Sequence, residues 1–335
     1  MIMKNTLIPL CLALVYLTIG CAFGQLLPTY KWAATVKVVG EDGAPVAGAD
    51  VAVSYNILPA PSDPNQKSYG EIKGLTDTNG MFSASHTDSS WSLGINIEKA
   101  GYYTTHIGHE LYQPGQLDDK TVAASRNPTI AVTLKKIGKP IPMYAKRINS
   151  EPVIFKKTGR PPIAFTNSVG YDLMAGDWVA PCGKGQATDL VVTEAFDKKS
   201  VSDYDYKLTI SFPNAGDGIQ EFAVPETEKG SGLRSPHEAP ADGYQSQLVR
   251  ENFHHPGQAG KSDYDENRNY FFRVRTVLDS NGNVKSALYG KIYGDPDQMN
   301  FRYYLNPTPN SRNMEFDSRQ NLFKNLPSLD QVSAP

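Results

Sequence analysis

The sequence predicts an all-β fold: a small N-terminal β-sandwich, followed by a larger antiparallel β-sandwich or jelly-roll-like domain. Three observations support this prediction. The 335 residues include 28 Gly, 24 Pro and 18 Tyr, without long helical periodicity. Several segments alternate apolar and polar residues with period two, which places successive side chains on opposite faces of a strand. The length fits two domains.

The first 24 residues are expected to be a secretory signal peptide rather than part of the fold. Lys4 is the only charged residue among them, residues 7–19 are mostly apolar, and Ala22-Phe23-Gly24 carries small residues where a signal peptidase reads. The apolar run is shorter than the roughly 20 residues that a membrane-spanning helix needs. We therefore expect cleavage after Gly24, no membrane span, and export to the periplasm, the cell surface or the extracellular space.

The three cysteines offer one alternative for this leader. Cys21 follows a segment close to a bacterial lipoprotein box, so a lipid anchor at Cys21 is the second processing route. It is the weaker one, because Thr18 stands where a large apolar residue is expected. Cys11 and Cys21 both lie in the leader, so the exported chain keeps only Cys182 and has no internal disulfide. We expect Cys182 to be a packed thiol rather than a nucleophile.

The charge balance excludes some classes of partner. The formal net charge is −2, and loss of the leader with Lys4 makes it −3. The chain carries neither a basic stripe that would indicate nucleic acid as a partner nor an acidic tail.

Alternation and turn signals place the elements of the first domain. Asp77-Thr78-Asn79-Gly80 is expected to be a hairpin turn, because Asn-Gly tolerates the positive φ angles of a tight reversal. The loop 58–70 contains three prolines and is expected to be exposed. Strands are expected around residues 36–39, 51–57, 95–97 and 130–134.

Three motifs of this region resemble a known family. They are the run Gly43-Ala-Pro45-Val46-Ala-Gly48-Ala49-Asp-Val51, the turn Thr76-Asp77-Thr-Asn79-Gly80-Met-Phe82 and the segment Lys99-Ala-Gly101-Tyr102. Together they resemble a carboxypeptidase regulatory-like domain, which is similar to transthyretin, over residues 31–136. The resemblance implies a β-sandwich that is usually a non-catalytic accessory of secreted enzymes, receptors and surface proteins. Residues 58–70 and 111–127 are longer than a minimal member needs.

The rest of the chain is unassigned to any family. Residues 137–149 are expected to be a linker, because prolines stiffen this stretch and the strand pattern stops there. Residues 150–325 are expected to form the antiparallel β domain, and residues 326–335 a flexible tail. This domain is expected to be built around strands at 204–212, 268–278 and 284–294.

The last two of these strands carry a register prediction. A two-residue turn at Asn281-Gly282 would set Leu278 opposite Lys285, and the apolar faces would disagree. An odd-length loop centred on Asn281 sets Leu278 opposite Val284, and register follows the buried face. The same register predicts two cation–aromatic pairs on the other face, Arg273 with Tyr289 and Lys291 with Phe271.

No motif in the sequence indicates a metal, a cofactor or a known catalytic centre. His106-x-x-His109-Glu110 lacks the spacing of a zinc protease, and the neighbours His254-His255 point apart in an extended chain. Asp279-x-Asn281-x-Asn283 resembles the start of a calcium loop, but Gly290 stands at the twelfth position and a hairpin explains these residues. No His is followed three residues later by Glu, and no nucleophile elbow, phosphate loop or dinucleotide fingerprint occurs.

Aromatic side chains are the remaining candidates for a binding site. A group in the second domain could form a platform that stacks on sugar rings, and core packing is the favoured alternative. The candidate ligand-binding residues are Trp178, Tyr289, Tyr293 and Tyr303.

The sequence therefore predicts an exported, non-enzymatic binding or structural module, with a glycan or an extracellular protein as its partner. The alternative is an unrecognised, glycan-active hydrolase with its site in the second domain. Its two carboxylates would come from different strands and leave no local signature. The identity of the ligand and the oligomeric state do not follow from the residues.

Overall fold

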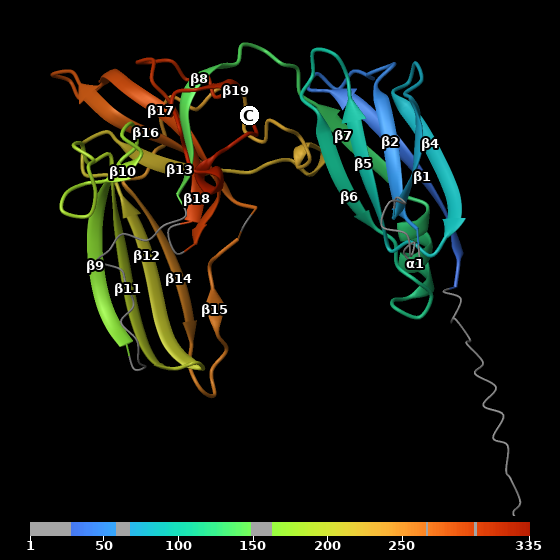
Figure 1. Ribbon diagram of the computed structural model, residues 1–335, viewed down its shortest axis with the longest axis horizontal. Helices are drawn as coiled ribbons and strands as arrows, with labels where there is room; N and C mark the ends of the chain where they lie inside the picture. Colours follow the sequence, from blue (N-terminus) through green and yellow to red (C-terminus); the bar gives the residue numbers. More distant parts are fainter. Residues whose placement is uncertain (1–27, 58–67, 149–162, 266, 298–299) are drawn as a thin grey trace, which may run out of the picture.

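The computed structural model describes residues 28–57, 68–148, 163–265, 267–297 and 300–335. Within these residues the chain is mostly β-structure, and it forms two halves that lie side by side (Figure 1). The all-β fold class is confirmed. The expected leader with Cys21, most of the loop 58–70 and the start of the expected second domain lie outside the described residues.

The first half packs two sheets against each other, with strand orders β4-β1-β7 and β3-β2-β5-β6. Its strands are β1 (Tyr30–Gly40), β2 (Asp50–Asn56), β3 (Tyr69–Leu75), β4 (Met81–Asp88), β5 (Ser92–Glu98), β6 (Thr105–Glu110) and β7 (Thr129–Leu134). Alternate side chains fill the core between the sheets, such as Val36 on β1, Val53 on β2 and Ile95 on β5. All the strands expected from alternation are present, and β7 pairs with β1 in parallel.

The turn at 77–80 forms as expected, but it is not a hairpin. Asp77 Oδ1 accepts hydrogen bonds from the backbone N–H groups of Asn79 and Met81, and Gly80 has a φ of +73°. However, β3 pairs with β2 while β4 pairs with β1, so this turn carries the chain from one sheet to the other. Local residues encode the reversal, whereas the core decides which sheet each strand joins.

One helix, α1 (Asp119–Arg126), was not expected from the sequence. It lies in the long segment 111–127. Asp118 caps it, because its carboxylate accepts from the backbone N–H of Thr121 at 3.0 Å. Among the described residues, no helix has the length and apolar character needed to cross a membrane.

The second half also packs two sheets, with strand orders β10-β9-β11-β12-β14-β15 and β13-β16-β17-β18-β8-β19. Large apolar side chains from both sheets fill the core, among them Tyr171, Leu208 and Phe272. Its strands are β8 (Ile141–Ile148), β9 (Ile163–Asp172), β10 (Asp177–Trp178), β11 (Leu190–Ser200), β12 (Asp203–Ser211), β13 (Gly218–Phe222), β14 (Gln247–His254), β15 (Lys261–Ser262), β16 (Asn269–Leu278), β17 (Val284–Asp297), β18 (Asn300–Asn306) and β19 (Phe316–Asn321).

The register predicted for the hairpin of β16 and β17 is confirmed. Leu278 lies opposite Val284, and the loop between them closes with a hydrogen bond from the Asp279 N–H to the Asn283 carbonyl. The expected partners across the other face are also opposite each other, Arg273 with Tyr289 and Phe271 with Lys291.

The rings that these two cations face are different from those expected. The Arg273 guanidinium lies over the Tyr244 ring at 4.8 Å, and Lys291 Nζ lies 4.8 Å from the ring of Tyr293 and 4.9 Å from that of Tyr304. The long cation side chains reach past their direct neighbours, so the strand register alone does not decide which ring they contact.

The expected linker and the expected loose tail both belong to the packed second half. β8 lies within the linker range, and it pairs with β18 from Tyr144 onward and with β19 at Ile141 and Met143. Near the C-terminus, Val332 is 7% exposed, and the Ala334 carbonyl accepts a hydrogen bond from the Tyr304 hydroxyl at 3.0 Å. Isolated contacts of this kind leave no periodic pattern in the sequence.

Candidate functional site

A loop of the second half pairs with an edge strand of the first half. The chain between β13 and β14 crosses toward β6 and β7 and carries the short 3-10 helix η2 (Glu226–Glu228) (Figure 1). Gly230 accepts from the N–H of His106 at 2.9 Å, and the Gly232 N–H donates to the Thr104 carbonyl at 2.9 Å. These two hydrogen bonds pair backbone groups at the edge of β6, which would lack partners if the edge strand were uncovered.

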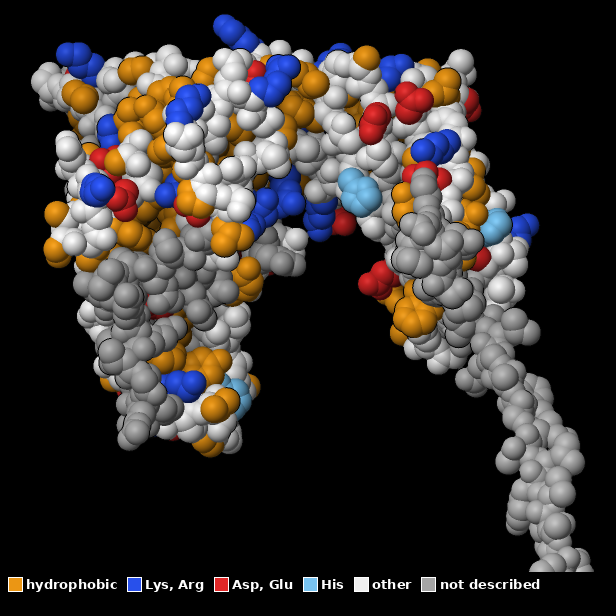
Figure 2. All heavy atoms as spheres, viewed as in Figure 1, with side chains coloured by type: hydrophobic (Ala, Val, Ile, Leu, Met, Phe, Trp, Pro, Cys, Tyr) orange, Lys and Arg blue, Asp and Glu red, His pale blue; other side chains and the backbone are white. Residues whose placement is uncertain are grey.

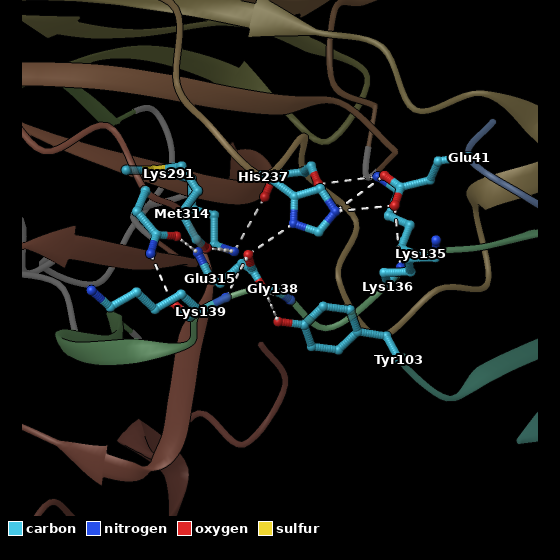
Figure 3. Close-up of polar contacts among 12 residues, drawn as sticks. Glu41, Tyr103, Lys135, Lys136, Gly138, Lys139, His237, Lys291, Met314 and Glu315 are labelled. Carbon is cyan, nitrogen blue, oxygen red and sulfur yellow. Dashed lines mark hydrogen bonds and ion pairs between the residues drawn. The ribbon is translucent and has the colours of Figure 1, made fainter. Parts of the chain in front are cut away.

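Glu315 is the buried carboxylate at the centre of this junction. Its side chain is 5% exposed. It accepts from the Tyr103 hydroxyl at 2.7 Å, from the backbone N–H groups of Gly138 at 2.8 Å and Lys139 at 3.2 Å, and from His237 Nδ1 at 2.9 Å (Figure 3). Donors from the first half, the connecting chain and the second half therefore meet on one carboxylate.

The pKa values of this pair follow from burial and hydrogen bonding. Burial alone would raise the pKa of Glu315, but hydrogen bonds from Tyr103, His237 and the backbone hold it below its ordinary value. Burial, together with the Glu315 carboxylate, raises the pKa of the Tyr103 hydroxyl. Glu315 thus remains an acceptor and Tyr103 a donor across the physiological range.

His237 lies between two carboxylates from opposite halves (Figure 3). Its Nδ1 faces Glu315, and its Nε2 lies 3.1 and 3.3 Å from the two oxygens of Glu41. Ionised carboxylates only accept hydrogen bonds, so both contacts together require N–H groups on both ring nitrogens. In that state the imidazolium joins Glu41 of the first half to Glu315 of the second.

Two buried lysines extend the same network. Lys135 is 3% exposed on its side chain, pairs with Glu228 at 2.7 Å, and donates to the Ser235 carbonyl at 3.1 Å. Lys291 donates to the Ser235 hydroxyl at 3.2 Å, the Tyr293 hydroxyl at 2.9 Å and the Met314 carbonyl at 2.6 Å. Three acceptors match the three donors of the Lys291 ammonium group.

The Ser235–Lys291 contact is the arrangement closest to a nucleophile with its base. Burial lowers the pKa of Lys291, as a base of this kind requires. However, both side chains are fully buried. A substrate carbonyl has no route to the Ser235 hydroxyl in this state, so the contact is structural.

The four aromatic residues expected to bind a ligand do not form one exposed platform. They lie in three separate clusters of buried residues: Trp178 and Tyr303 in the main core, Tyr289 beside Tyr244, and Tyr293 beside Tyr304. Core packing therefore accounts for most of their surface. Their exposed fractions are 5% for Trp178, 5% for Tyr289, 4% for Tyr293 and 0% for Tyr303.

The histidine motifs have local partners. His109 Nε2 lies 2.8 Å from the Ser125 carbonyl, and His255 lies between Asp203 at 2.9 Å and Asp205 at 3.2 Å. Hydrogen bonding to Asp203 raises the pKa of His255. Among the residues that the structure describes, no group of three His, Cys, Asp or Glu side chains is placed to hold a metal ion.

A shallow groove of about 560 Å³ lies on the exposed face of β9, β11, β12 and β14. Asp197 and Asp205 stand directly opposite each other on its floor, and Phe253 lines its side. Lys207 in the same groove pairs with Glu251 at 3.3 Å. Asp50 and Glu98, which also stand directly opposite each other, line a second groove on the first half.

Sequence reasoning missed the junction because its members are far apart in the chain. Tyr103 and Glu315 are separated by 212 positions, and His237 and Glu41 by 196. No spacing rule links such residues. The only local signal was the pair of glycines around Ser231, which allow close backbone approach.

Comparisons with known proteins place the chain in no family. No family model matches it, and no curated protein matches it. A 3-chlorocatechol 1,2-dioxygenase from Rhodococcus opacus 1CP is 18% identical at a TM-score of 0.24, over 32% of this chain and 60% of the dioxygenase chain.

Two pilins match a longer part of the chain. The shaft pilin SpaA from Lactobacillus rhamnosus GG is 13% identical at a TM-score of 0.22, over 57% of this chain and 90% of the pilin chain. A streptococcal ancillary pilin is 14% identical at a TM-score of 0.21, over 53% of this chain and 52% of the pilin chain. Likenesses this distant carry no argument about function.

Proposed function

We propose that this chain is an exported, non-enzymatic binding or structural module whose two β-sandwiches act as one rigid unit. The observation that carries the proposal is Glu315, a buried carboxylate that accepts from Tyr103 of one half and His237 of the other. A buried carboxylate that loses a hydrogen-bond donor is destabilised by about 1–3 kcal/mol. The two halves therefore stabilise each other's orientation.

The first half supports the finer part of the proposal. Its two-sheet sandwich spans residues 30–134 and matches the extent expected for a carboxypeptidase regulatory-like domain, 31–136. We propose that it serves as a non-catalytic accessory, with export directed by the residues before Gln25. A glycan or an extracellular protein is the proposed partner.

The chemistry of the junction favours a structural role over an enzymatic one. A general acid in a glycosidase needs a raised pKa, whereas hydrogen bonds hold the pKa of Glu315 low. Its oxygens are engaged by four donors and have no room for a substrate proton. Ser235 and Lys291 are closed to solvent.

One observation favours the alternative, a glycan-active hydrolase. Asp197 and Asp205 lie opposite each other in an open groove with Phe253 at its side, and a pair of carboxylates is what glycoside hydrolysis requires. The groove is shallow, and both aspartates are exposed. Exposure does not provide the desolvation that would raise the pKa of one of them.

The test is a glycan array with two readouts on the chain from Gln25 onward. Bound protein and released sugar are measured together, for the wild type and for Asp197→Asn. We expect saturable binding to a subset of glycans, or none, with no released sugar from either protein. Sugar release by the wild type that disappears in Asp197→Asn would establish the hydrolase instead.

A further inference from the structure

Three arginines of the second half line one pocket of about 350 Å³. Arg147 on β8 and Arg302 on β18 stand directly opposite each other in the ladder. Arg234 comes from the loop that crosses to the first half. All three side chains are half-buried. Figure 2 shows Lys and Arg side chains gathered on the second half where it borders the hollow between the halves.

The strand register explains why these groups share one face. Arg302 lies opposite Tyr293 on β17, and Tyr293 lies opposite Asn269 on β16. Residues at opposite positions in a sheet project from the same face. Arg147, Arg302, Tyr293 and Asn269 therefore form one row, and the Arg234 guanidinium lies 5.8 Å from the centre of the Tyr293 ring.

The three positive charges have no negative partner in the described part of the chain. No ion pair joins Arg147, Arg234 or Arg302 to a carboxylate there. Like charges directly opposite each other in a sheet destabilise it. Such an arrangement is typical of a binding site at which an anionic ligand supplies the negative charge. Proteins accept a local loss of stability at functional sites.

Asp295, a carboxylate that lines this pocket, is already engaged by other donors. One of its oxygens accepts from Arg250 Nε at 2.9 Å and from the Tyr270 hydroxyl. The other accepts from the Asp265 N–H at 2.8 Å and from Arg268 at 3.2 Å. Asp295 therefore does not neutralise the three arginines.

The positive potential of the pocket reaches the neighbouring core. Burial raises the pKa of Tyr304, whereas the charges of Arg302, Arg234 and Arg147 each act in the opposite direction. All three guanidinium groups thus act on one hydroxyl, that of Tyr304, which lies two positions from Arg302 on the same face of β18.

The number and origin of the arginines indicate the kind of anion. Arg147 and Arg302 project side by side from β8 and β18, and Arg234 comes from a separate loop. A phosphate or sulfate ester offers three terminal oxygens in a tetrahedral arrangement, whereas a carboxylate offers two in one plane. Guanidinium forks match the oxygen pairs of such groups. The other walls are polar, with Asn267 and Asn300 among them.

A second, smaller cavity of about 110 Å³ adjoins the pocket, since Arg234 and Asn267 line both. Asn269 lines it too and is 2% exposed. Its amide nitrogen donates to the Asn267 carbonyl at 2.7 Å, but its Oδ1 has no hydrogen-bond partner among the described residues. A buried acceptor without a donor favours a ligand that brings a hydroxyl group.

We propose that the pocket of Arg147, Arg234 and Arg302 binds a phosphate or sulfate group carried by a hydroxyl-bearing molecule such as a sugar. This binding site goes beyond the structural role proposed above and does not depend on it.

The test is calorimetric titration at constant ionic strength near neutral pH, with inorganic phosphate, inorganic sulfate, glucose 6-phosphate and glucose as probes. We expect saturable binding of the anionic probes, tightest for glucose 6-phosphate, and none of glucose. Arg147→Gln and Arg302→Gln should each weaken binding by roughly tenfold or more. Arg319→Gln is the matched control, because Arg319 is 88% exposed and pairs with Asp317. It should bind like the wild type.

Thermal unfolding gives a second readout that also shows the variants are folded. Without an anion, Arg302→Gln should melt at or above the wild-type temperature, because it removes a like-charge contact. Glucose 6-phosphate should then raise the melting temperature of the wild type and of Arg319→Gln, and should raise that of Arg147→Gln and Arg302→Gln by less. A wild type that binds none of the anions at millimolar concentration, or an affinity that is unchanged in both Arg147→Gln and Arg302→Gln, would overturn the proposal. Equal affinity for inorganic phosphate and glucose 6-phosphate would overturn the claim that the ligand carries a hydroxyl group recognised by the protein.

Discussion

The Tyr103 hydroxyl donates a 2.7 Å hydrogen bond to Glu315 Oε2, across the boundary between the two sandwiches and across 212 positions of sequence. Tyr103 is 6% exposed, and Glu315 is 4% exposed. A hydrogen bond to a buried charge is among the stronger contacts that a side chain makes. This bond therefore contributes to how the halves are held together, and its removal can be measured.

Replacing Tyr103 by Phe removes that hydroxyl and leaves the ring in place. We expect the free energy of unfolding to fall by about 1–2 kcal/mol, since a charged acceptor loses one donor and keeps three others. Tyr112→Phe is the matched control, because its hydroxyl bonds to Glu110 in an exposed position. Urea unfolding of both variants checks this expectation. Equal decreases in the free energy of unfolding would show that the Tyr103 hydrogen bond stabilises the protein no more than an exposed one does.

The pH dependence of stability should report on Glu315. The ordinary pKa is 4.5, and the folded-state pKa lies below it because of the hydrogen bonds to the carboxylate. Because the pKa of Glu315 is lower in the folded state than in the unfolded state, the ionised carboxylate stabilises the fold fully at pH values above the unfolded-state pKa. This stabilisation is lost as the pH falls through the folded-state pKa. We expect Glu315→Gln to be less stable than the wild type by about 2–3 kcal/mol at neutral pH. The difference should shrink as the pH falls below 4.5.

Glu238→Gln is the control for this measurement, because Glu238 is exposed and pairs with Arg312 on the surface. Its stability should follow the wild type at every pH. A Glu315→Gln deficit that stays constant down to acidic pH would mean that the ionised carboxylate is not what stabilises the junction.

A substitution at Gly230 tests whether the backbone pairing between this loop and β6 stabilises the junction. A Cβ at this position would lie 2.3 Å from the His106 carbonyl oxygen, so the backbone pairing has to move apart. We expect Gly230→Ala to cost about 2 kcal/mol. Gly108→Ala, on the same strand β6, meets nothing within 4 Å and should be close to neutral. Thermal unfolding of the two variants distinguishes a specific close contact from a general effect of alanine.

The turn of the β16–β17 hairpin provides a test of backbone conformation. Gly282 has a φ of +81°, and a Cβ there would meet no atom within 4 Å. Gly282→Ala should therefore cost about 1 kcal/mol through the left-handed conformation alone. Gly282→Asn should cost less, because asparagine tolerates this region. If alanine and asparagine are equally harmful, backbone strain at this turn is not the cause.

The sequence predicted those parts of the fold that depend on neighbouring residues. Alternation placed the strands, and the buried face that carries Val274 and Leu288 agrees with the predicted hairpin register, because a shift of one residue reverses every side chain. Asp118 before α1 was an available capping signal, but eight residues of helix are too few for a clear period.

The candidate site could not be predicted in the same way. Glu315 meets Tyr103 and His237 only because two sandwiches dock, and docking leaves no spacing rule in the chain. Likewise, Arg147 and Arg302 become neighbours only through the pairing of β8 with β18. The aromatic candidates are buried in separate clusters, because loops and other strands cover the face of β17 that carries Tyr289 and Tyr293 while its other face fills the main core.

Fluorotryptophan NMR during urea unfolding tests most directly whether the two halves form one unit. Trp32 reports on the first half and Trp178 on the second, and Trp91→Phe removes the third resonance. We predict a single shared midpoint for Trp32 and Trp178, which separates into two midpoints when Glu315→Gln and Gly230→Ala are combined. Two distinct midpoints in the protein without the junction substitutions would contradict the account.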